Sequence, residues 1–182
     1  MSYADIPGYC DFYPIYLAAV RDAPKGATLV EVGVFLGHSL AYLARCALDS
    51  GRDDLTLVGI DPWEWNGTHP DVQAVLDEAG GKSRDAFDLM MRRHAPEELA
   101  RVNVLQAKSA DIHHPAWFVF VDADHSYEGV RDDIAHWEPL VAPGGILAGH
   151  DHTDQFPGVK RACVEAFGAD GYRVQGTSWV RK

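Results

Sequence analysis

Short apolar runs typical of β-strands alternate with segments of helical periodicity along most of this chain. The run 117–121 is continuously apolar, which predicts a central strand buried on both faces. Apolar residues at helical spacing, such as Leu36, Leu40 and Leu43, follow strand-like runs. Because parallel strands are joined by right-handed crossovers, this alternation predicts an α/β fold built on a doubly wound, Rossmann-like sheet.

The strand-like runs give the strands of the predicted sheet in their order along the chain. Five are expected to belong to βα units and two more to close the sheet: 28–32, 55–60, 102–106, 117–121, 146–149, 172–175 and 178–181. The last two flank Gly176-Thr177, so we expect an antiparallel hairpin there. Pro143-Gly144-Gly145 is expected to form a turn, and Gly80-Gly81 to separate two short helices. The predicted sheet is thus mainly parallel with an antiparallel C-terminal strand pair.

The length of 182 residues predicts a single domain over 1–182, with enough chain to bury one large core. Residues 1–26 are expected to form a short helical segment before the first strand. The stretch 62–97, which carries Trp63, Trp65 and His69, is expected to form a lid or a substrate insertion.

The chain carries 16 basic and 27 acidic residues, a formal net charge of −11. A surface this negative repels phosphate backbones, so we expect no nucleic-acid partner, whereas a cationic ligand is not repelled. The longest apolar run, 116–121, is too short to span a bilayer, and the N-terminus lacks a signal-peptide pattern. Three cysteines without a CxxC pair (Cys10, Cys46 and Cys163) favour a reducing compartment. We therefore expect a cytoplasmic protein with no membrane partner.

The first predicted strand runs into a glycine turn, Glu31-Val-Gly33-Val-Phe-Leu-Gly37. Glycines at such a strand end let the backbone turn sharply, and the helix that follows offers free N–H groups to an anion. The spacing matches neither dinucleotide-binding folds nor a phosphate-binding loop. Asp61, at the end of the second strand, is placed to accept hydrogen bonds from both ribose hydroxyls. Together these features predict a nucleoside-like ligand.

The same pattern, with Gly59-Ile-Asp61, resembles the cofactor site of class I S-adenosylmethionine-dependent methyltransferases. The stretches 121–130, 143–151 and 156–159 resemble bacterial small-molecule O-methyltransferases related to the macrocin and catechol enzymes. The resemblance implies S-adenosylmethionine as the cofactor and a set of residues that bind it: Glu31, Gly33, Gly37, Ser39, Asp61, Trp63, Ser109 and Asp122.

Two positions near the adenine end of this predicted site have competing interpretations. Ser109 fits the serine that lies by the adenine in the family, but Lys108 stands where the family often has Asp. Trp63 is expected either to stack on the adenine or line the pocket, or to be a plain core aromatic.

Acids and histidines gather where the fourth and fifth predicted strands end. The segments 122–125 (Asp-Ala-Asp-His) and 150–152 (His-Asp-His) would converge if the two strands are neighbours. The resemblance implies a divalent metal with three ligands: Asp122, His150 and Asp151. It also implies that His125, as a neutral imidazole, takes the proton of a substrate hydroxyl. An imidazole ligand suits Mn, Fe or Zn better than Mg, so the ion (Mg, Mn or similar) stays open.

The expected function is therefore S-adenosylmethionine-dependent O-methylation of a small-molecule hydroxyl, with Asp122 and His125 as catalytic residues. The alternatives are a metal-independent N- or carboxyl-methyltransferase, a nicotinamide oxidoreductase, which the glycine spacing disfavours, and a non-catalytic nucleoside-binding module. Asp124 or Ser126 is alternatively expected to cap the following helix. Because the region before the first strand is short, we expect it to roof little of the pocket and a second subunit to supply a wall, which favours a homodimer.

Overall fold

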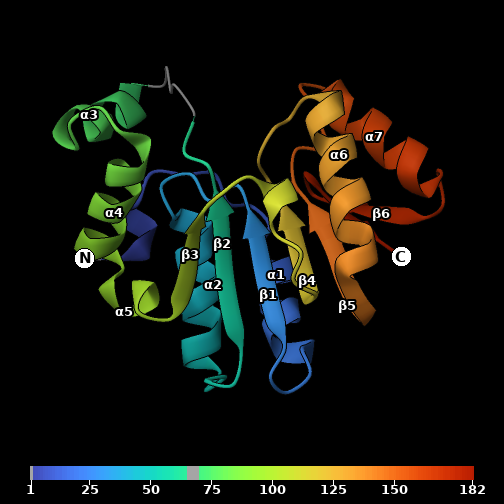
Figure 1. Cartoon of the computed structure of the whole chain (residues 1–182), viewed down its shortest axis with the longest axis horizontal. Helices are drawn as coiled ribbons and strands as arrows, with labels where there is room; N and C mark the ends of the chain where they lie inside the picture. Colours follow the sequence, from blue (N-terminus) through green and yellow to red (C-terminus); the bar gives the residue numbers. More distant parts are fainter. Residues whose placement is uncertain (1, 65–69) are drawn as a thin grey trace.

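The computed structural model describes residues 2–64 and 70–182, which form a seven-stranded sheet with helices on both faces (Figure 1). In spatial order the strands are β3 (Val102–Gln106), β2 (Thr56–Asp61), β1 (Thr28–Val32), β4 (Ala116–Val121), β5 (Val141–Gly149), β7 (Ser178–Arg181) and β6 (Tyr172–Gln175). The first five are parallel neighbours, whereas β7 runs antiparallel to both β5 and β6. The predicted fold class is confirmed.

Helices cover both faces of this sheet. The α-helices are α1 (Tyr13–Asp22), α2 (His38–Asp49), α3 (Pro70–Glu78), α4 (Ser83–His94), α5 (Pro96–Leu99), α6 (Tyr127–Trp137) and α7 (Pro157–Phe167). Single 3₁₀ turns lie at η1 (Tyr3–Asp5), η2 (Ser109–Asp111) and η3 (Glu138–Leu140). In Figure 1, α1 and α2 lie behind the sheet and α6 lies in front of it. None of the helices in the described part of the chain has the length and hydropathy needed to cross a membrane.

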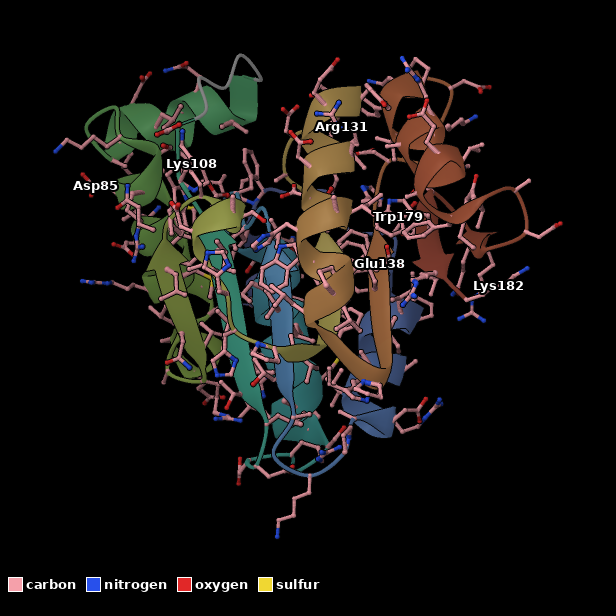
Figure 2. All side chains as sticks on the ribbon, turned by 45° about the vertical axis from the view of Figure 1, so that its right-hand side comes forward. Asp85, Lys108, Arg131, Glu138, Trp179 and Lys182 are labelled. Atoms are coloured by element: carbon pink, nitrogen blue, oxygen red, sulfur yellow. The ribbon has the colours of Figure 1, made fainter. Side chains whose placement is uncertain are left out.

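Each face of the sheet contributes to a separate apolar core because side chains alternate along every strand. Leu29 and Phe118 face α1, α2 and α4, and both are fully buried. Val30 and Val119, one position further along the same strands, face α6 and α7. Trp179, labelled in Figure 2, joins this second core from β7, with its ring 5.8 Å from that of Phe167.

Two predicted connections differ from the structure. Pro143-Gly144-Gly145 is not a separate turn, because it lies inside β5, beside a register shift between Ala116 and Phe118 of β4. A Cβ atom on Gly145 would lie only 2.4 Å from the carbonyl oxygen of Trp117. The irregular first part of β5, next to β4, therefore requires glycine at this position. The prediction of five βα units is also wrong, since β3 and β4 are joined by the single turn η2 rather than by a helix.

The stretch 62–97, predicted as a lid, contributes in part to the core. The break at Gly80-Gly81 is confirmed, and both glycines have positive φ angles. Phe87 and Met91 of α4 are fully buried, so α4 is a fixed wall of the molecule. Trp65 and His69 lie outside the described residues.

The N-terminal residues 2–12 differ from the expectation that they roof little of the pocket. They cross the carboxyl edge of the sheet from α2 to β5, with Ile6 and Phe12 buried. The carbonyl oxygen of Ile6 lies 2.7 Å from Nδ1 of His38, the first residue of α2. At the other end, the ring of Phe12 packs 4.9 Å from that of His150. The segment therefore covers the edge at which the predicted site residues lie.

Candidate functional site

The glycine turn brings the end of β1 close to the end of β4. Gly33 has a φ of 88°, and a Cβ atom there would lie 2.1 Å from the carbonyl oxygen of Asp122. Gly37 has a φ of 98°, and its Cβ would meet Met91 and Phe87 of α4. Only glycine fits these two positions, because both the backbone conformation and the space exclude a side chain.

The turn leads into the N-terminus of α2, which starts at His38 with Gly37 as its N-cap. No side chain in the described part of the chain caps this end, and the first helical hydrogen bond is donated by the N–H of Ala41. The preceding N–H groups and the positive end of the helix dipole therefore suit an anionic group such as a carboxylate.

Glu31 lies beneath the turn with no exposed surface. Its two oxygens accept hydrogen bonds from the Tyr16 hydroxyl at 2.8 Å and the Ser39 hydroxyl at 2.6 Å. Burial raises the pKa of Glu31 to about 8, against the two hydrogen bonds, which lower it. The structure thus places Glu31 behind the predicted cofactor surface, where it fixes Ser39 on the first turn of α2.

Asp61 is also nearly buried, and it organises the backbone of the turn. One carboxylate oxygen accepts the N–H groups of Val34 and Phe35 at 2.8 and 2.9 Å. The other accepts the N–H of Trp63 at 2.6 Å and has capacity for a further donor. A contact with ribose hydroxyls stays a prediction that this second oxygen can serve.

Trp63 packs as a core aromatic and also lines a pocket with Lys82 and Arg84, so a contact with the adenine stays a prediction. Its indole is buried against Phe87, with ring centroids 5.1 Å apart, and its Nε1 donates to the carbonyl of Phe35. Ser109 uses its hydroxyl to accept a hydrogen bond from Trp137 Nε1 of α6, at 2.7 Å. The neighbouring Lys108, labelled in Figure 2, lies at the same sheet edge and is exposed.

Three side chains from the ends of β4 and β5 converge beside the glycine turn. Asp122, His125 and Asp151 each offer one ligand atom, and these atoms lie within 4.8 Å of one another. His125 Nε2 is 2.9 Å from Asp151 Oδ2 and 3.6 Å from Asp122 Oδ1. Asp151 has a φ of 57°, an unusual backbone conformation that aims its carboxylate at this point.

His150 faces the same acids with its other ring nitrogen turned away. Its Nδ1 lies 3.5 Å from Asp122 and 3.4 Å from Asp151. Its Nε2 lies 2.9 Å from Asp11 and 2.7 Å from the Thr177 hydroxyl. The group of possible ligand atoms found among the described residues thus has His125 beside the two predicted acids, and the predicted ligand set of Asp122, His150 and Asp151 stays a prediction.

The two acids change the charge of both histidines. Asp122 and Asp151 raise the pKa of His125 to about 9, against burial, which lowers it. Burial likewise lowers the pKa of His150, but the same two acids outweigh it and raise the value to about 10. Burial raises the pKa of Asp151, yet the two histidines outweigh it and hold it below its usual range. Without a cation the two acids thus favour the protonated imidazole of His125, and its role as a neutral base stays a prediction.

Asp124 and Ser126 have the structural role that the sequence offered as an alternative. Ser126 is the N-cap of α6 and accepts the N–H of Gly129 at 3.0 Å. Asp124 accepts hydrogen bonds from the N–H and the hydroxyl of Ser126. Both side chains therefore fix the start of α6 next to the cluster.

Sequence reasoning missed Asp11, Thr177 and Tyr16. Asp11 lies in a segment without periodicity, and Thr177 lies in a hairpin turn, where threonine is ordinary. Tyr16 occurs among the apolar residues of α1, so its sequence position predicts only a core residue. Nothing in the sequence signalled that these three would reach His150 and Glu31.

The residues present fit a divalent cation. His125 Nε2 is buried and makes no well-aligned hydrogen bond to any described residue, although a carboxylate oxygen lies 2.9 Å away. Two carboxylates and an imidazole nitrogen form a donor set suited to Mn²⁺ or Zn²⁺. The uncapped α2 N-terminus and the spare acceptor capacity of Asp61 likewise fit a cofactor that carries a carboxylate and a ribose.

Comparisons with known proteins agree with this geometry. A family model described as a methyltransferase domain matches residues 30–152, more than half of the chain. A comparison with curated protein sequences gave no match.

Among solved structures, the chain is similar to the O-methyltransferase NovP, with a TM-score of 0.63 and 18% identity over 93% of this chain and 78% of NovP. It is similar to CalS11, a TDP-rhamnose 3'-O-methyltransferase of calicheamicin biosynthesis (TM-score 0.57, 17% identity, 93% of this chain and 76% of that one). It is also similar to cofactor-bound Rv0187 from MTB (TM-score 0.64, 17% identity, 98% and 84%). At these identities the likeness to solved structures shows the fold alone. The chain therefore belongs to the methyltransferase domain family and has the class I methyltransferase fold.

Proposed function

We propose that this protein is an S-adenosylmethionine-dependent O-methyltransferase that acts on a small-molecule hydroxyl with the help of a divalent cation. The observation that carries the proposal is the convergence of Asp122, His125 and Asp151 beside the glycine turn. Family membership supports methyl transfer, and the printed activities of NovP and CalS11 support oxygen as the acceptor atom.

When bound, S-adenosylmethionine supplies an electrophilic sulfonium methyl group. Gly33 and Gly37 let the chain turn beside the space that this ligand would occupy, and the α2 N-terminus faces its carboxylate. Asp61 would accept from its ribose, and Asp122, at the β4 end, would lie near its amino group and the reacting methyl. Glu31 acts indirectly, because its hydrogen bonds hold Ser39 in place.

A divalent cation at Asp122, His125 and Asp151 supplies positive charge that makes an acceptor hydroxyl more acidic. The two carboxylates also orient the acceptor, since methyl transfer requires the attacking oxygen to be aligned with the sulfonium. His125 would then act as the third ligand through Nε2 rather than as the base, because a ring nitrogen that holds the cation has no lone pair left to take a proton.

Cofactor binding gives the first test. Isothermal titration with S-adenosylhomocysteine should show binding, and titration with NAD should show none. Binding of NAD alone would favour a nicotinamide oxidoreductase instead, and binding of neither ligand would refute the proposed function.

His125→Ala separates the ligand role from the base role. We expect normal S-adenosylhomocysteine affinity, at least tenfold weaker Mn²⁺ binding and loss of most methyl transfer to a catechol or sugar hydroxyl panel. The control is His114→Ala, an exposed histidine whose Nδ1 lies 2.9 Å from the carbonyl oxygen of its neighbour Pro115. Unchanged Mn²⁺ affinity with lost turnover would make His125 the base, and unchanged turnover would exclude both roles.

The remaining proposals concern the surroundings of the enzyme. Three free cysteines suit a reducing, cytoplasmic location. A homodimer stays our proposal, to be checked by sedimentation, although residues 2–12 already cover part of the edge where a second subunit was expected to supply a wall. If a chelator leaves methyl transfer unchanged, the metal-independent N- or carboxyl-methyltransferase becomes the better description.

A further inference from the structure

We propose that Asp11 and Thr177 are positioning residues of the active site, which hold the His150 imidazole so that its Nδ1 faces Asp122 and Asp151. This inference deepens the proposed function and rests on it, since the acid pair is the proposed cation site. It assigns part of the reaction centre to the N-terminal segment and to the C-terminal hairpin, two parts of the chain that lie outside the glycine turn and the β4 and β5 ends.

Four contacts link His150, Asp11 and Thr177, and two of them involve one ring nitrogen. His150 Nε2 lies 2.9 Å from Asp11 Oδ1 and 2.7 Å from Thr177 Oγ1. The Thr177 hydroxyl also lies 2.8 and 2.7 Å from the two oxygens of Asp11. A carboxylate only accepts hydrogen bonds, so both His150 Nε2 and the Thr177 hydroxyl must donate to Asp11. The arrangement therefore fixes a proton on Nε2.

Each partner is itself held by the fold. Thr177 lies in the β6–β7 turn, and its carbonyl accepts the N–H of His152 at 2.8 Å, which ties the turn to the chain after β5. Asp11 precedes Phe12, which is buried and packs its ring against His150. The His150 side chain is only 10% exposed, whereas that of Asp11 is 54% exposed. The network thus anchors a nearly buried ring from the solvent side.

The orientation of this ring matters for the acids. With Nε2 engaged, the opposite nitrogen faces Asp122 at 3.5 Å and Asp151 at 3.4 Å. A ring free to turn would lose this position beside both carboxylates, which are also the proposed cation ligands. Groups that orient residues around a metal site typically change its affinity by about 10- to 100-fold when removed.

Proton exchange tests the orientation without cofactor or metal. In ¹⁵N-histidine-labelled protein, the Nε2–H of His150, assigned with His150→Gln, should exchange slowly with water. We expect roughly tenfold faster exchange in Asp11→Asn and in Thr177→Val, because each loses a partner of this N–H. Thr177→Ser, which keeps the hydroxyl, and Asp170→Asn, an exposed aspartate, should match the wild type. Unchanged exchange in both Asp11→Asn and Thr177→Val overturns the proposal.

Mn²⁺ titration tests the consequence for the acid pair. Asp11→Asn and Thr177→Val should bind Mn²⁺ about tenfold more weakly, with unchanged S-adenosylhomocysteine affinity and a melting temperature near that of the wild type. Thr177→Ser should restore the affinity. Wild-type Mn²⁺ affinity in both variants also overturns the positioning role. If the wild type binds no Mn²⁺, the cation role in the proposed function is refuted, and if it binds no S-adenosylhomocysteine, the cofactor role is refuted. In either case the exchange rates alone test whether Asp11 and Thr177 orient His150.

Discussion

At the scale of single residues, buried carboxyl groups hold more of the backbone and side chains of this site in place than exposed carboxyl groups do. Glu31 and Asp61 were expected to touch the cofactor. Both accept hydrogen bonds from the protein itself, and Asp61 keeps capacity for a further donor. A carboxyl group without solvent is stable only where protein donors replace water. The two acids therefore hold the turn that a ligand would contact. We expect their removal to lower the free energy of unfolding before it affects any other property.

Glu31 makes the stability of the protein depend on pH. Its pKa of about 8 in the folded protein lies above its ordinary value of 4.5, so the folded state holds a proton that the unfolded state has released. Glu31 thus stabilises most at low pH, and its contribution is lost as the pH rises from about 4.5 to about 8. Relative to Glu31→Gln, the wild type should lose free energy of unfolding by up to about 1.4 kcal/mol per pH unit in this range.

Urea unfolding of both proteins between pH 6 and 8.5 measures this difference. Glu128→Gln, which changes an exposed glutamate, should follow the wild type at every pH. A gap between wild type and Glu31→Gln that stays constant with pH would show that Glu31 is ionised in the folded protein.

At the scale of elements, the turn between β1 and α2 depends on backbone shape more than on side-chain chemistry. Gly33 has both a positive φ and a backbone neighbour within the space of a Cβ atom. Gly51, after α2, has a positive φ of 61° but open space around it. The pair therefore separates the cost of backbone strain from the cost of a steric clash.

Gly33→Ala should lower the free energy of unfolding by about 3 kcal/mol or more and abolish S-adenosylhomocysteine binding, because the β1 turn must move away from β4. Gly51→Ala should cost about 1 kcal/mol and leave binding unchanged. Urea unfolding and titration calorimetry measure both effects. Equal losses in the two variants would mean that the contact with the Asp122 backbone is not important.

At the scale of the whole molecule, the net charge of −11 opposes compaction through self-repulsion. Salt screens such repulsion over roughly 10 Å at 0.1 M. We therefore expect the melting temperature to rise by a few degrees between 10 and 150 mM NaCl at pH 7.5. Sucrose of equal osmolality is the control and should produce a smaller rise. A melting temperature that falls with added salt would show that ion pairs such as Arg45–Glu98 outweigh the net repulsion.

The sequence by itself determined the strands of the sheet and the edge at which the candidate site residues lie. The predicted β3, 102–106, and the two hairpin strands, 172–175 and 178–181, match the structure in full, because strand length, alternation and turn residues are local properties. The glycine turn and the acids and histidines after β4 and β5 were recognisable for the same reason. The spatial order of the strands, by contrast, came from the tertiary structure.

Only the tertiary structure decided what each candidate site residue contacts. Which ring packs against Trp63, which ring nitrogen of His150 meets the acids, and which acid of β5 lies beside His125 depend on neighbours far away in the sequence. The N-terminal Asp11 and the hairpin Thr177 meet at His150 although 166 positions separate them. Side-chain direction and charge are set by such contacts between distant segments, and local periodicity carries no information about them.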